Sequence, residues 1–575
     1  MARQQLSGTE IEPAPHRFNL TAYCLGPSAL RRPGRTGLIV VHDAAAPLEA
    51  AEQWTFESLD LAVRHVGAGL LATGMRPGDR LLLRLGNTSD AALLFFGAIA
   101  VGLVAVPTSA MLTADEVAFV VADAEPALVA ASPELRHTVP AGVPVIGPAE
   151  VARWVSGVGF AQRAAEYAAT GADDPAFLVY TSGTTGDPKG VLHAHRSAWG
   201  RRPMYAGWLG IGPQDVLVHA GAFNWTYTLG VGLTDPWANG ATAVIYNGPR
   251  DPAVWGRIIA LVQATLFAAV PGVYRQLLAS HGVEGVDLSS LRHGLTAGEA
   301  LSPDLHAAWV SMTGKPLYEA LGMSEISTYI SSGPSVPTRP GSPGKPQAGR
   351  RVAILPVDVR GGADAGAAEV EVEVEVEVEV EVEVEQGATG LLAVHRSDPG
   401  LMLGYWRRPD EEAKAYRGSW FVGGDLAHLD REGYLIHHGR ADDVMNAQGY
   451  RVSPQEVEKV LAGAPGVADV GVTEVEVRPG VRVITAFIVV SKDSSLGAQV
   501  SSPTAQDSSP TAQAILEYAG EHLAAYKVPK QVRFVRSLPR TANGKVIRRE
   551  LHRVADGEPQ ALSSAATTEP RPDSA

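Results

Sequence analysis

The sequence predicts an α/β protein, with a large N-terminal domain of several subdomains and a smaller C-terminal α/β domain. Its 575 residues, 45% of them hydrophobic, are enough to bury more than one large core. Short apolar runs alternate with helical patterns over most of the chain, which is typical of α/β layers. We place the joint between the two domains at Gly439–Asp443.

The first clear unit of this kind is an apolar run at 80–85 followed by a helical pattern from Asp90 to Val101. The stretch 91–106 is uncharged, but a membrane span needs about 20 residues and Pro107 ends the stretch. We therefore expect a buried helix that runs into a buried strand, and no membrane span. Further strands are predicted around 216–219, 242–246 and 265–270.

The run Tyr180–Gly190 (YTSGTTGDPKG) follows an apolar strand candidate at 176–179. Glycines let backbone N–H groups turn toward an anion, hydroxyls add donors, and Lys189 brings a mobile positive charge. The run therefore predicts a polyphosphate cradle. It differs from G-x-x-x-x-G-K-[ST], because Lys189 precedes the last glycine. A flexible linker is the alternative, which the apolar segments on both sides disfavour.

Most of the formal charge of −14 is local, since the alternating Glu-Val run from Glu369 to Glu385 contains nine glutamates. That run, and the repeat of Ser501–Gln506 at Ser508–Gln513, are interpreted as insertions in surface loops. The remaining chain is mildly acidic, so no nucleic-acid surface is expected. One cysteine, and a start without an apolar signal segment, predict a cytoplasmic location.

The cradle resembles the phosphate-binding signature of the AMP-forming acyl-CoA synthetases, in the superfamily that includes luciferases and peptide-synthetase adenylation domains. The resemblance runs from about Trp54 to about Leu551 and is closest to medium-chain and benzoate-CoA ligases. It implies the adenylate-forming enzyme fold, with an N-terminal domain at 1–438, a hinge at 439–442 and a mobile C-terminal domain at 443–556. Residues 557–575, rich in Ser, Thr, Pro and Ala, are expected to be disordered.

The implied reaction activates a carboxylic acid, which does not react with a thiol in water because its leaving group would be oxide. ATP converts the acid to an acyl-adenylate with release of pyrophosphate, and CoA then displaces AMP to form a thioester. Such an enzyme needs a polyphosphate cradle, an adenosine site, a Mg²⁺ site and a cation that screens two approaching anions. The expected ligands are ATP, Mg²⁺, CoA and a small carboxylic acid.

The resemblance assigns nucleotide-binding roles to three motifs: the cradle, the segment at 297–301 and the segment at 318–325. Ser324 would contact the phosphate as a catalytic residue, and Glu325, with Thr184, would hold Mg²⁺. The family commonly has an adenine-stacking tyrosine where this chain has Leu321, so we expect adenine to pack against an aliphatic side chain. The other expected contacts are Thr181, Ser182, Gly183, Thr185, Gly186 and Lys189 in the cradle, and Gly298, Glu299, Ala300, Gly322 and Met323 around adenine.

Motifs from the last third of the chain complete the resemblance. Asp425 and Arg440 would bind the ribose, and Asp442 would be the hinge about which the C-terminal domain swings. Lys545 follows Asn-Gly at a loop tip and would be the adenylation lysine. For the thioester step, the expected residues are Gly449, which leaves room for pantetheine, and Arg451, which faces the phosphate.

The acid itself is expected to be medium-chain or aromatic. The residues that line its tunnel by resemblance carry no charge, and apolar walls favour an apolar tail by about 0.8 kcal/mol per buried CH₂. Those residues are Phe223, Asn224, Trp225, Val270, Gly298 and Met323. If Trp225 were only a core residue, it would plug the tunnel and favour short acids.

Three alternatives remain at this point. The chain could be a peptide-synthetase adenylation domain, although Asn224 follows Phe223 where those enzymes commonly carry Asp. It could pass the acyl group from the adenylate to a carrier protein or another acceptor, or it could be a catalytically silent nucleotide-binding protein. The sequence does not fix the oligomeric state, and a homodimer is compatible with it.

Overall fold

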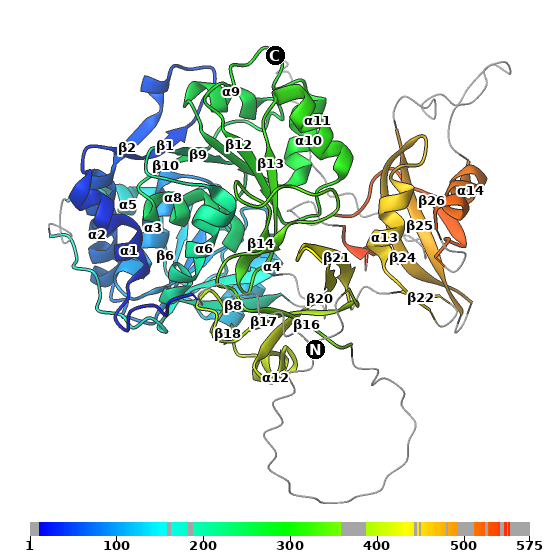
Figure 1. Ribbon diagram of the computed structural model, residues 1–575. Helices are drawn as coiled ribbons and strands as arrows, with labels where there is room; N and C mark the ends of the chain where they lie inside the picture. Colours follow the sequence, from blue (N-terminus) through cyan, green and yellow to red (C-terminus); the bar gives the residue numbers. More distant parts are fainter. Residues whose placement is uncertain are drawn as a thin grey trace, which may run out of the picture. The chain divides into compact units, whose positions relative to one another are not determined.

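A computed structural model describes residues 11–157, 163–181, 188–357, 387–441, 445–447, 450–478, 481–491, 511–523, 527–540, 546–548 and 550–551. The chain forms two compact units, Met1–His437 and His438–Ala575, whose elements are labelled in Figure 1. The Glu-Val run, most of the repeat at 501–513 and the tail from 557 lie outside the described residues. The domain bounds inferred from the sequence stay a prediction.

A nine-stranded sheet is the largest element of the first unit, in the order β15-β14-β13-β12-β11-β9-β10-β1-β2. Its six inner strands, from β13 to β1, are parallel, and the strands at both edges are antiparallel. The strands are β1 (Thr36–Val41), β2 (Glu52–Thr55), β9 (Val216–His219), β10 (Thr242–Tyr246), β11 (Leu266–Ala269), β12 (His293–Ala297), β13 (Leu317–Met323), β14 (Ser327–Ser331) and β15 (Lys345–Pro346). The three strands predicted at 216–270 are confirmed as β9, β10 and β11.

Three helices alternate along the chain with strands of this sheet and lie together in Figure 1. They are α9 (Val254–Leu261), α10 (Pro271–Ala279) and α11 (Pro303–Thr313). Ile258, Tyr274 and Trp309 from these helices are fully buried with Phe267 of β11. Short helices α6 (Arg202–Met204), α7 (Thr226–Leu229) and α8 (Asp235–Ala238) supply Met204, Tyr227 and Trp237 to further clusters. The carboxyl ends of the parallel strands are where open α/β sheets bind ligands.

A seven-stranded sheet, in the order β18-β8-β7-β4-β3-β5-β6, forms the second layer of this unit. Its strands are β3 (Arg80–Arg84), β4 (Val104–Pro107), β5 (Leu128–Ala131), β6 (Val145–Ile146), β7 (Pro175–Thr181), β8 (Lys189–Ala194) and β18 (Gly404–Tyr405). Helices α1 (Leu20–Arg31), α2 (Phe56–Ala72), α3 (Ser89–Ala100), α4 (Ala114–Ala124) and α5 (Pro148–Val155) accompany it. Figure 1 draws α1, α2, α3 and α5 side by side.

The uncharged stretch at 91–106 is confirmed as a buried helix, α3, followed by the buried strand β4. Within the described ranges, no helix combines the length and the apolar character that crossing a membrane requires. Cys24, the only cysteine of the sequence, lies on α1 with 1% of its surface exposed. Burial raises the pKa of its thiol.

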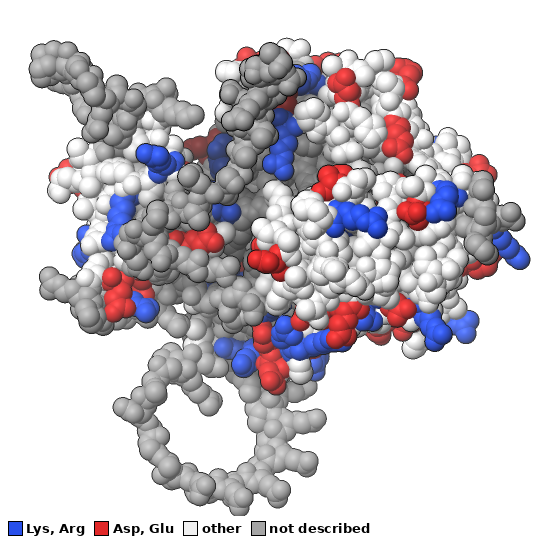
Figure 2. All heavy atoms as spheres, turned by 180° about the vertical axis from the view of Figure 1, so that it is seen from behind, with Lys and Arg blue, Asp and Glu red and all other residues white. Residues whose placement is uncertain are grey.

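A five-stranded sheet completes the first unit, although its strand β21 continues past His437, where that unit ends. Its strands are β16 (Val352–Leu355), β17 (Gly390–His395), β19 (Tyr416–Arg417), β20 (Trp420–Leu429) and β21 (Leu435–Arg440), accompanied by helix α12 (Pro409–Lys414). β16 and β17 are paired by Leu355 and Leu391, on either side of the Glu-Val run. On the face that Figure 2 shows, basic and acidic side chains of this unit are interspersed.

The second unit has a core of its own, which includes Val457, Leu461, Ile484 and Ile515. Its strands form two sheets: β22 (Met445–Ala447) with β23 (Tyr450–Val452), and β24 (Val467–Arg478) with β25 (Val481–Val490) and β26 (Gln531–Phe534). Helices α13 (Pro454–Leu461) and α14 (Ala512–His522) pack on each other. The fold is therefore α/β in both units, as the sequence predicts.

Candidate functional site

The predicted polyphosphate cradle connects two paired strands of the seven-stranded sheet. β7 ends at Thr181 and β8 begins at Lys189, and these two residues are register partners. Ser182, Gly183, Thr184, Thr185 and Gly186 lie outside the described residues. The strand predicted at 176–179 is confirmed as the centre of β7. The sheet therefore fixes Thr181 and Lys189, the two residues that flank the rest of the predicted cradle.

The cation of the cradle, Lys189, already has an anionic partner. Its Nζ forms an ion pair with Glu411 on α12 and lies 5.5 Å from the centre of the Tyr405 ring. Only 18% of the Lys189 side chain and 29% of the Glu411 side chain are exposed. A polyphosphate that binds Lys189 would therefore replace an existing carboxylate contact.

The predicted metal ligand, Glu325, is held by the same tyrosine. The Tyr405 hydroxyl donates to Glu325 Oε1 over 2.7 Å, and strand pairing of β18 with β8 places Tyr405 beside Val191. His193 of β8 is hydrogen-bonded through Nε2 to the backbone oxygen of Ser324 at 2.9 Å. Burial lowers the pKa of His193 to about 3, so this imidazole is neutral and its Nε2–H is the donor. The Ser324-Glu325 turn is thus fixed by β8 and β18.

The predicted adenine contacts come from the ends of β12 and β13, which are parallel neighbours. Glu319 of β13 accepts a hydrogen bond from the backbone N–H of Leu301 over 2.9 Å, at the end of the segment that begins at Gly298. Burial raises the pKa of Glu319 to about 7, against the opposing effects of that N–H and of His437. Leu321 packs at the edge of an apolar cluster with buried Ile326 and Phe421.

The predicted ribose ligand, Asp425, lies on β20 with 13% of its side chain exposed. Its Oδ1 is 3.0 Å from Nε2 of His437 on β21. Gly423, two residues earlier, permits a close approach, because a Cβ there would lie 2.6 Å from the sulfur of Met323. This contact brings the end of β13 against the ribose motif, so the structure gathers Met323 and Asp425 in one place.

Three of the residues predicted to bind the acid meet at the carboxyl ends of the parallel strands. Gly298 has a φ of +94°, and a Cβ there would lie 3.1 Å from the Trp225 ring and 3.6 Å from Val270. Trp225 also packs edge-on against Tyr227, with ring centres 5.2 Å apart. Any side chain at 298 would therefore be strained and would press on the indole. Trp225, Val270 and Gly298 form one apolar wall.

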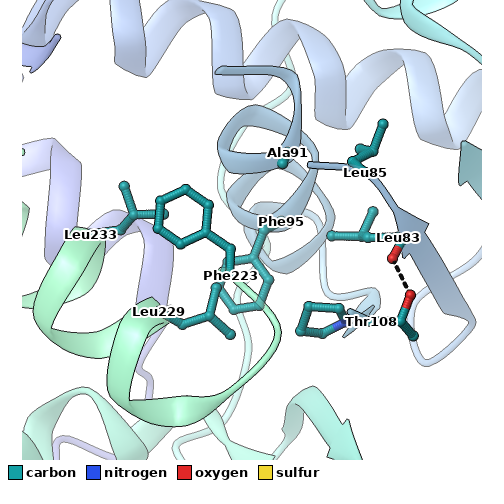
Figure 3. A pocket seen from close by; sticks show the side chains of 9 residues that line it. Leu83, Leu85, Ala91, Phe95, Thr108, Phe223, Leu229 and Leu233 are labelled. Atoms are coloured by element: carbon teal, nitrogen blue, oxygen red, sulfur yellow. Dashed lines mark hydrogen bonds between the residues drawn. The ribbon is translucent and has the colours of Figure 1, made fainter. Parts of the chain in front are cut away.

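Phe223 points elsewhere, into an apolar cavity of about 10 Å³ shown in Figure 3. The ring lies among side chains from α3, from β3 and from the helical segment that follows Phe223 in the chain. These side chains are Leu83, Phe95, Leu229 and Leu233. A volume of this size holds about one water molecule. Trp225 does not line this cavity, and the role of Phe223 as an acid contact stays a prediction, as does that of Asn224.

The segment that carries Trp225 is anchored by two polar contacts that the sequence did not single out. Asn87, just after β3, donates to the backbone oxygen of Gly221 at 2.6 Å and accepts from the N–H of Phe223 at 3.2 Å. Further on, buried Arg201 forms a bidentate pair with Asp235, with both contacts at 2.7 Å. Its remaining nitrogen, Nη1, donates to Ser327 Oγ at 2.6 Å. Arg201 thus joins the helical segment to the strand that follows Glu325.

Residues of the second unit can be placed only within that unit. Arg440 ends β21, and the backbone of Arg451 pairs with Asn446 in the β22–β23 hairpin. Asp442, Gly449 and Lys545 lie outside the described residues. Their predicted roles remain predictions.

Sequence reasoning missed four side chains that hold the predicted ligands: Tyr405, Glu411, His437 and Glu319. Glu319 and His437 lie within the metal-site and ribose motifs but were given no role there, whereas Tyr405 acts on Glu325 at a separation of 80 residues. A signal did exist for Glu319, an acidic residue in an otherwise apolar strand before Gly322. Within the described ranges, no three His, Cys, Asp or Glu side chains converge to form a metal cage.

Two family profiles match the chain. The profile described as AMP-binding enzyme covers residues 28–406, and the profile described as AMP-binding enzyme C-terminal domain covers residues 456–545.

Among curated proteins, the 3-hydroxybenzoate–CoA ligase of Aromatoleum sp. (strain CIB) is 31% identical over 521 residues, which is 88% of this chain and 92% of that protein. The benzoate–CoA ligase of Thauera aromatica is 29% identical over 551 residues, 93% of this chain and 96% of that protein. Among solved structures, the anthranilate CoA ligase AuaEII in complex with anthranoyl-AMP superposes with a TM-score of 0.78 at 26% identity, covering 94% of this chain and 98% of that one.

Proposed function

This chain belongs to the AMP-binding enzyme family, and we propose that it is an ATP-dependent carboxylic acid:CoA ligase that acts on aromatic acids. One observation carries the proposal. Tyr405 lies between the cradle lysine and the predicted metal ligand, since its ring faces Lys189 and its hydroxyl donates to Glu325. A cation for the polyphosphate and a carboxylate for a divalent ion are therefore neighbours in one unit, as phosphoryl-activating chemistry requires.

The reaction proceeds in two displacements. A carboxylate oxygen of the acid attacks the α-phosphorus of ATP, the bond between the α-phosphorus and its bridging oxygen breaks, and pyrophosphate leaves. The sulfur of CoA then attacks the carbonyl carbon of the acyl-adenylate, its proton passes to solvent, and AMP leaves. Both steps bring anions together, so positive charge and oriented donors lower the barriers.

The chain's residues would divide this work as follows. The cradle from Thr181 to Lys189 holds the β- and γ-phosphates, Ser324 contacts the phosphate, and Asp425 and Arg440 hold the ribose. Lys545 screens the carboxylate and the α-phosphate in the first step. Rotation about Asp442 then brings Gly449 and Arg451 to the nucleotide for the second step.

A divalent ion fits the donor set. Mg²⁺ is typically held by one or two carboxylates together with substrate phosphates and water. Glu325 is a carboxylate of this kind, fixed at Oε1 by Tyr405, and Thr184 would add its hydroxyl. Bound there, Mg²⁺ would neutralise charge on the ATP phosphates.

The apolar wall supports an aromatic acid in preference to a short one. Trp225, Val270 and Gly298 offer an uncharged apolar wall, and the missing Cβ of Gly298 lets the backbone approach the edge of the indole closely. Aromatic pairs add about 0.5–1.5 kcal/mol to the burial of apolar area. The two curated relatives named above act on benzoate and 3-hydroxybenzoate. Medium-chain acids are the second candidate, because the same wall would accept an alkyl tail.

A screen of acids tests the proposal. Pyrophosphate and AMP release would be measured with acetate, hexanoate, octanoate, benzoate and 3-hydroxybenzoate, with and without CoA. We expect the largest kcat/KM for an aromatic acid, and AMP release that depends on CoA. Glu325→Gln is the inactive control.

Each of the other outcomes of the screen would indicate a different function or a different class of acid. Pyrophosphate release that CoA does not turn into thioester would identify an enzyme that passes the acyl group to another acceptor. The absence of pyrophosphate release with every acid would favour a silent nucleotide-binding protein. Acetate as the best substrate would overturn the assignment to aromatic acids and indicate that Trp225 plugs the tunnel.

A further inference from the structure

His437 interacts with two carboxylates of the first unit. Its Nε2 is 3.0 Å from Oδ1 of Asp425, and only 16% and 13% of the two side chains are exposed. An ionised carboxylate can only accept hydrogen bonds, so Nε2 carries the hydrogen and donates it. The second carboxylate is that of Glu319, whose raised pKa His437 partly lowers.

These contacts connect the two predicted halves of the nucleoside site. Leu301, at the end of the adenine segment, donates its backbone N–H to Glu319. Glu319 interacts electrostatically with His437, and His437 donates to Asp425. The sequence of contacts therefore leads from the adenine motif on β12 and β13 to the ribose motif on β20, through one imidazole on β21.

We propose that His437 is a positioning residue for the nucleotide, which orients the Asp425 carboxylate to accept both ribose hydroxyls. The inference rests on the proposed function, because the ribose role of Asp425 belongs to it. A carboxylate can bind two neighbouring hydroxyls only when its plane is correctly turned. The hydrogen bond from His437 to Oδ1 fixes that plane before ATP arrives, which removes an ordering cost from binding.

Deoxynucleotides provide the test, because they remove one partner of Asp425 at a time. We would measure kcat and KM for pyrophosphate release with ATP, 2′-deoxy-ATP and 3′-deoxy-ATP in the wild type, His437→Phe and His437→Gln. The wild type should prefer ATP over both analogues by about tenfold or more, the scale of a hydrogen bond to a charged group. His437→Phe should raise the KM for ATP and reduce that preference by about fivefold, because the two deletions act on one contact. His437→Gln retains a hydrogen-bond donor and should therefore keep more of the preference for ATP than His437→Phe does.

A matched control is available on the surface. His281 lies 2.7 Å from Glu284 through Nδ1, a similar imidazole–carboxylate contact outside the site. His281→Phe should leave the preference for ATP unchanged. If His437→Phe lowers kcat/KM by the same factor for all three nucleotides, its role is structural and the proposal is wrong. Equal efficiency of the wild type with ATP and both analogues would also overturn it.

Failure of the proposed ligase function can be told apart from failure of the positioning role of His437. A wild type that releases no pyrophosphate with any acid would disprove the ligase, yet calorimetric titration with the same three nucleotides would still measure the preference. In that case, loss of the preference in His437→Phe supports the positioning role, and an unchanged preference contradicts it. Should His437→Phe fail to fold, His437→Ala, which also removes the donor, carries the same comparison.

Discussion

The hydroxyl of Tyr405 and the carboxylate of Glu325 are joined by a hydrogen bond of 2.7 Å, and the ring of the same tyrosine faces Lys189. One side chain therefore contacts both the predicted metal ligand and the predicted polyphosphate cation. β18, which carries Tyr405, pairs with β8, the strand that leaves the cradle. This pairing places Tyr405 and Lys189 on neighbouring strands.

Tyr405→Phe should raise the free Mg²⁺ concentration needed for half-maximal adenylation by about tenfold, the lower end of the effect of removing a partner from a metal ligand. The substitution retains the ring beside Lys189 and removes only the donor to Glu325. The measurement is the rate of pyrophosphate release against free Mg²⁺ at saturating ATP. Tyr246→Phe, which loses a hydroxyl contact to the backbone oxygen of Pro249, is the control. An unchanged Mg²⁺ dependence would contradict the metal role of Glu325.

Glu411→Gln should lower the KM for ATP by about two- to fivefold, the range of an ion pair worth a few tenths to 1 kcal/mol. In the structure Lys189 is paired with Glu411, so the polyphosphate must compete with that carboxylate. Steady-state kinetics at varied ATP would measure the change. Glu125→Gln removes an exposed pair with Arg407 and should have no effect. A higher KM would mean that Glu411 positions Lys189 for the phosphate and does not compete with it.

Glu319→Gln should remove part of the pH dependence of stability. Burial raises the folded pKa of Glu319 to about 7, above the ordinary value of 4.5, so the fold favours the protonated form. Its contribution is fully present below pH 4.5, falls as the pH rises toward 7 and is constant above that. Glutamine cannot ionise, and its side-chain oxygen can still accept from Leu301.

We therefore expect Glu319→Gln to gain stability relative to the wild type between pH 5 and 8, by about 1 kcal/mol or more, since one pKa unit corresponds to about 1.4 kcal/mol. Chemical unfolding across that range measures it. Glu150→Gln is a control of opposite sign, since the N–H of Gly147 lowers the pKa of Glu150. The same pH slope in Glu319→Gln and wild type would refute the assignment.

Lys545→Ala should cripple formation of the acyl-adenylate and spare thioester formation from supplied acyl-adenylate. The positive charge is needed only where the carboxylate and the α-phosphate approach each other. The two half-reactions would be measured separately, with Lys530→Ala as the control. Equal losses in both steps would exclude the proposed role.

Asp442→Pro should have the converse effect, because proline fixes φ and stiffens the proposed hinge. Adenylation should continue while thioester formation fails. Asp442→Ala removes the same carboxylate without fixing φ, so it separates the loss of rotation from the loss of charge. Normal turnover by the proline variant would show that no rotation about this residue is required.

The sequence predicted the strands well, because each is a short apolar run whose signal is local. The strands at 216–219 and 242–246 match β9 and β10 at both ends. The ligand motifs were equally accessible, since each lies within a few consecutive residues. The contacts among these motifs could not be predicted in this way. Tyr405 reaches Glu325 because β18 pairs with β8, and no local sequence pattern encodes that pairing.

The acid site marks the limit of this reasoning. Phe223 and Trp225 are two residues apart, and a linear tunnel motif treats them alike. The structure gives them different neighbours: Phe223, whose N–H donates to Asn87, lines the cavity of Figure 3, while Trp225 directly precedes α7 and lies against Gly298. Side-chain direction at such a junction depends on tertiary contacts.

Cys24 has a practical consequence. It is the single cysteine of the chain, it is buried on α1, and burial raises the pKa of its thiol, so the reactive thiolate is scarce. Fluorophores could therefore be attached through new cysteines, one in each compact unit, without removing a native thiol. Energy transfer between the two dyes would then follow the proposed swing about Asp442 in single molecules during turnover.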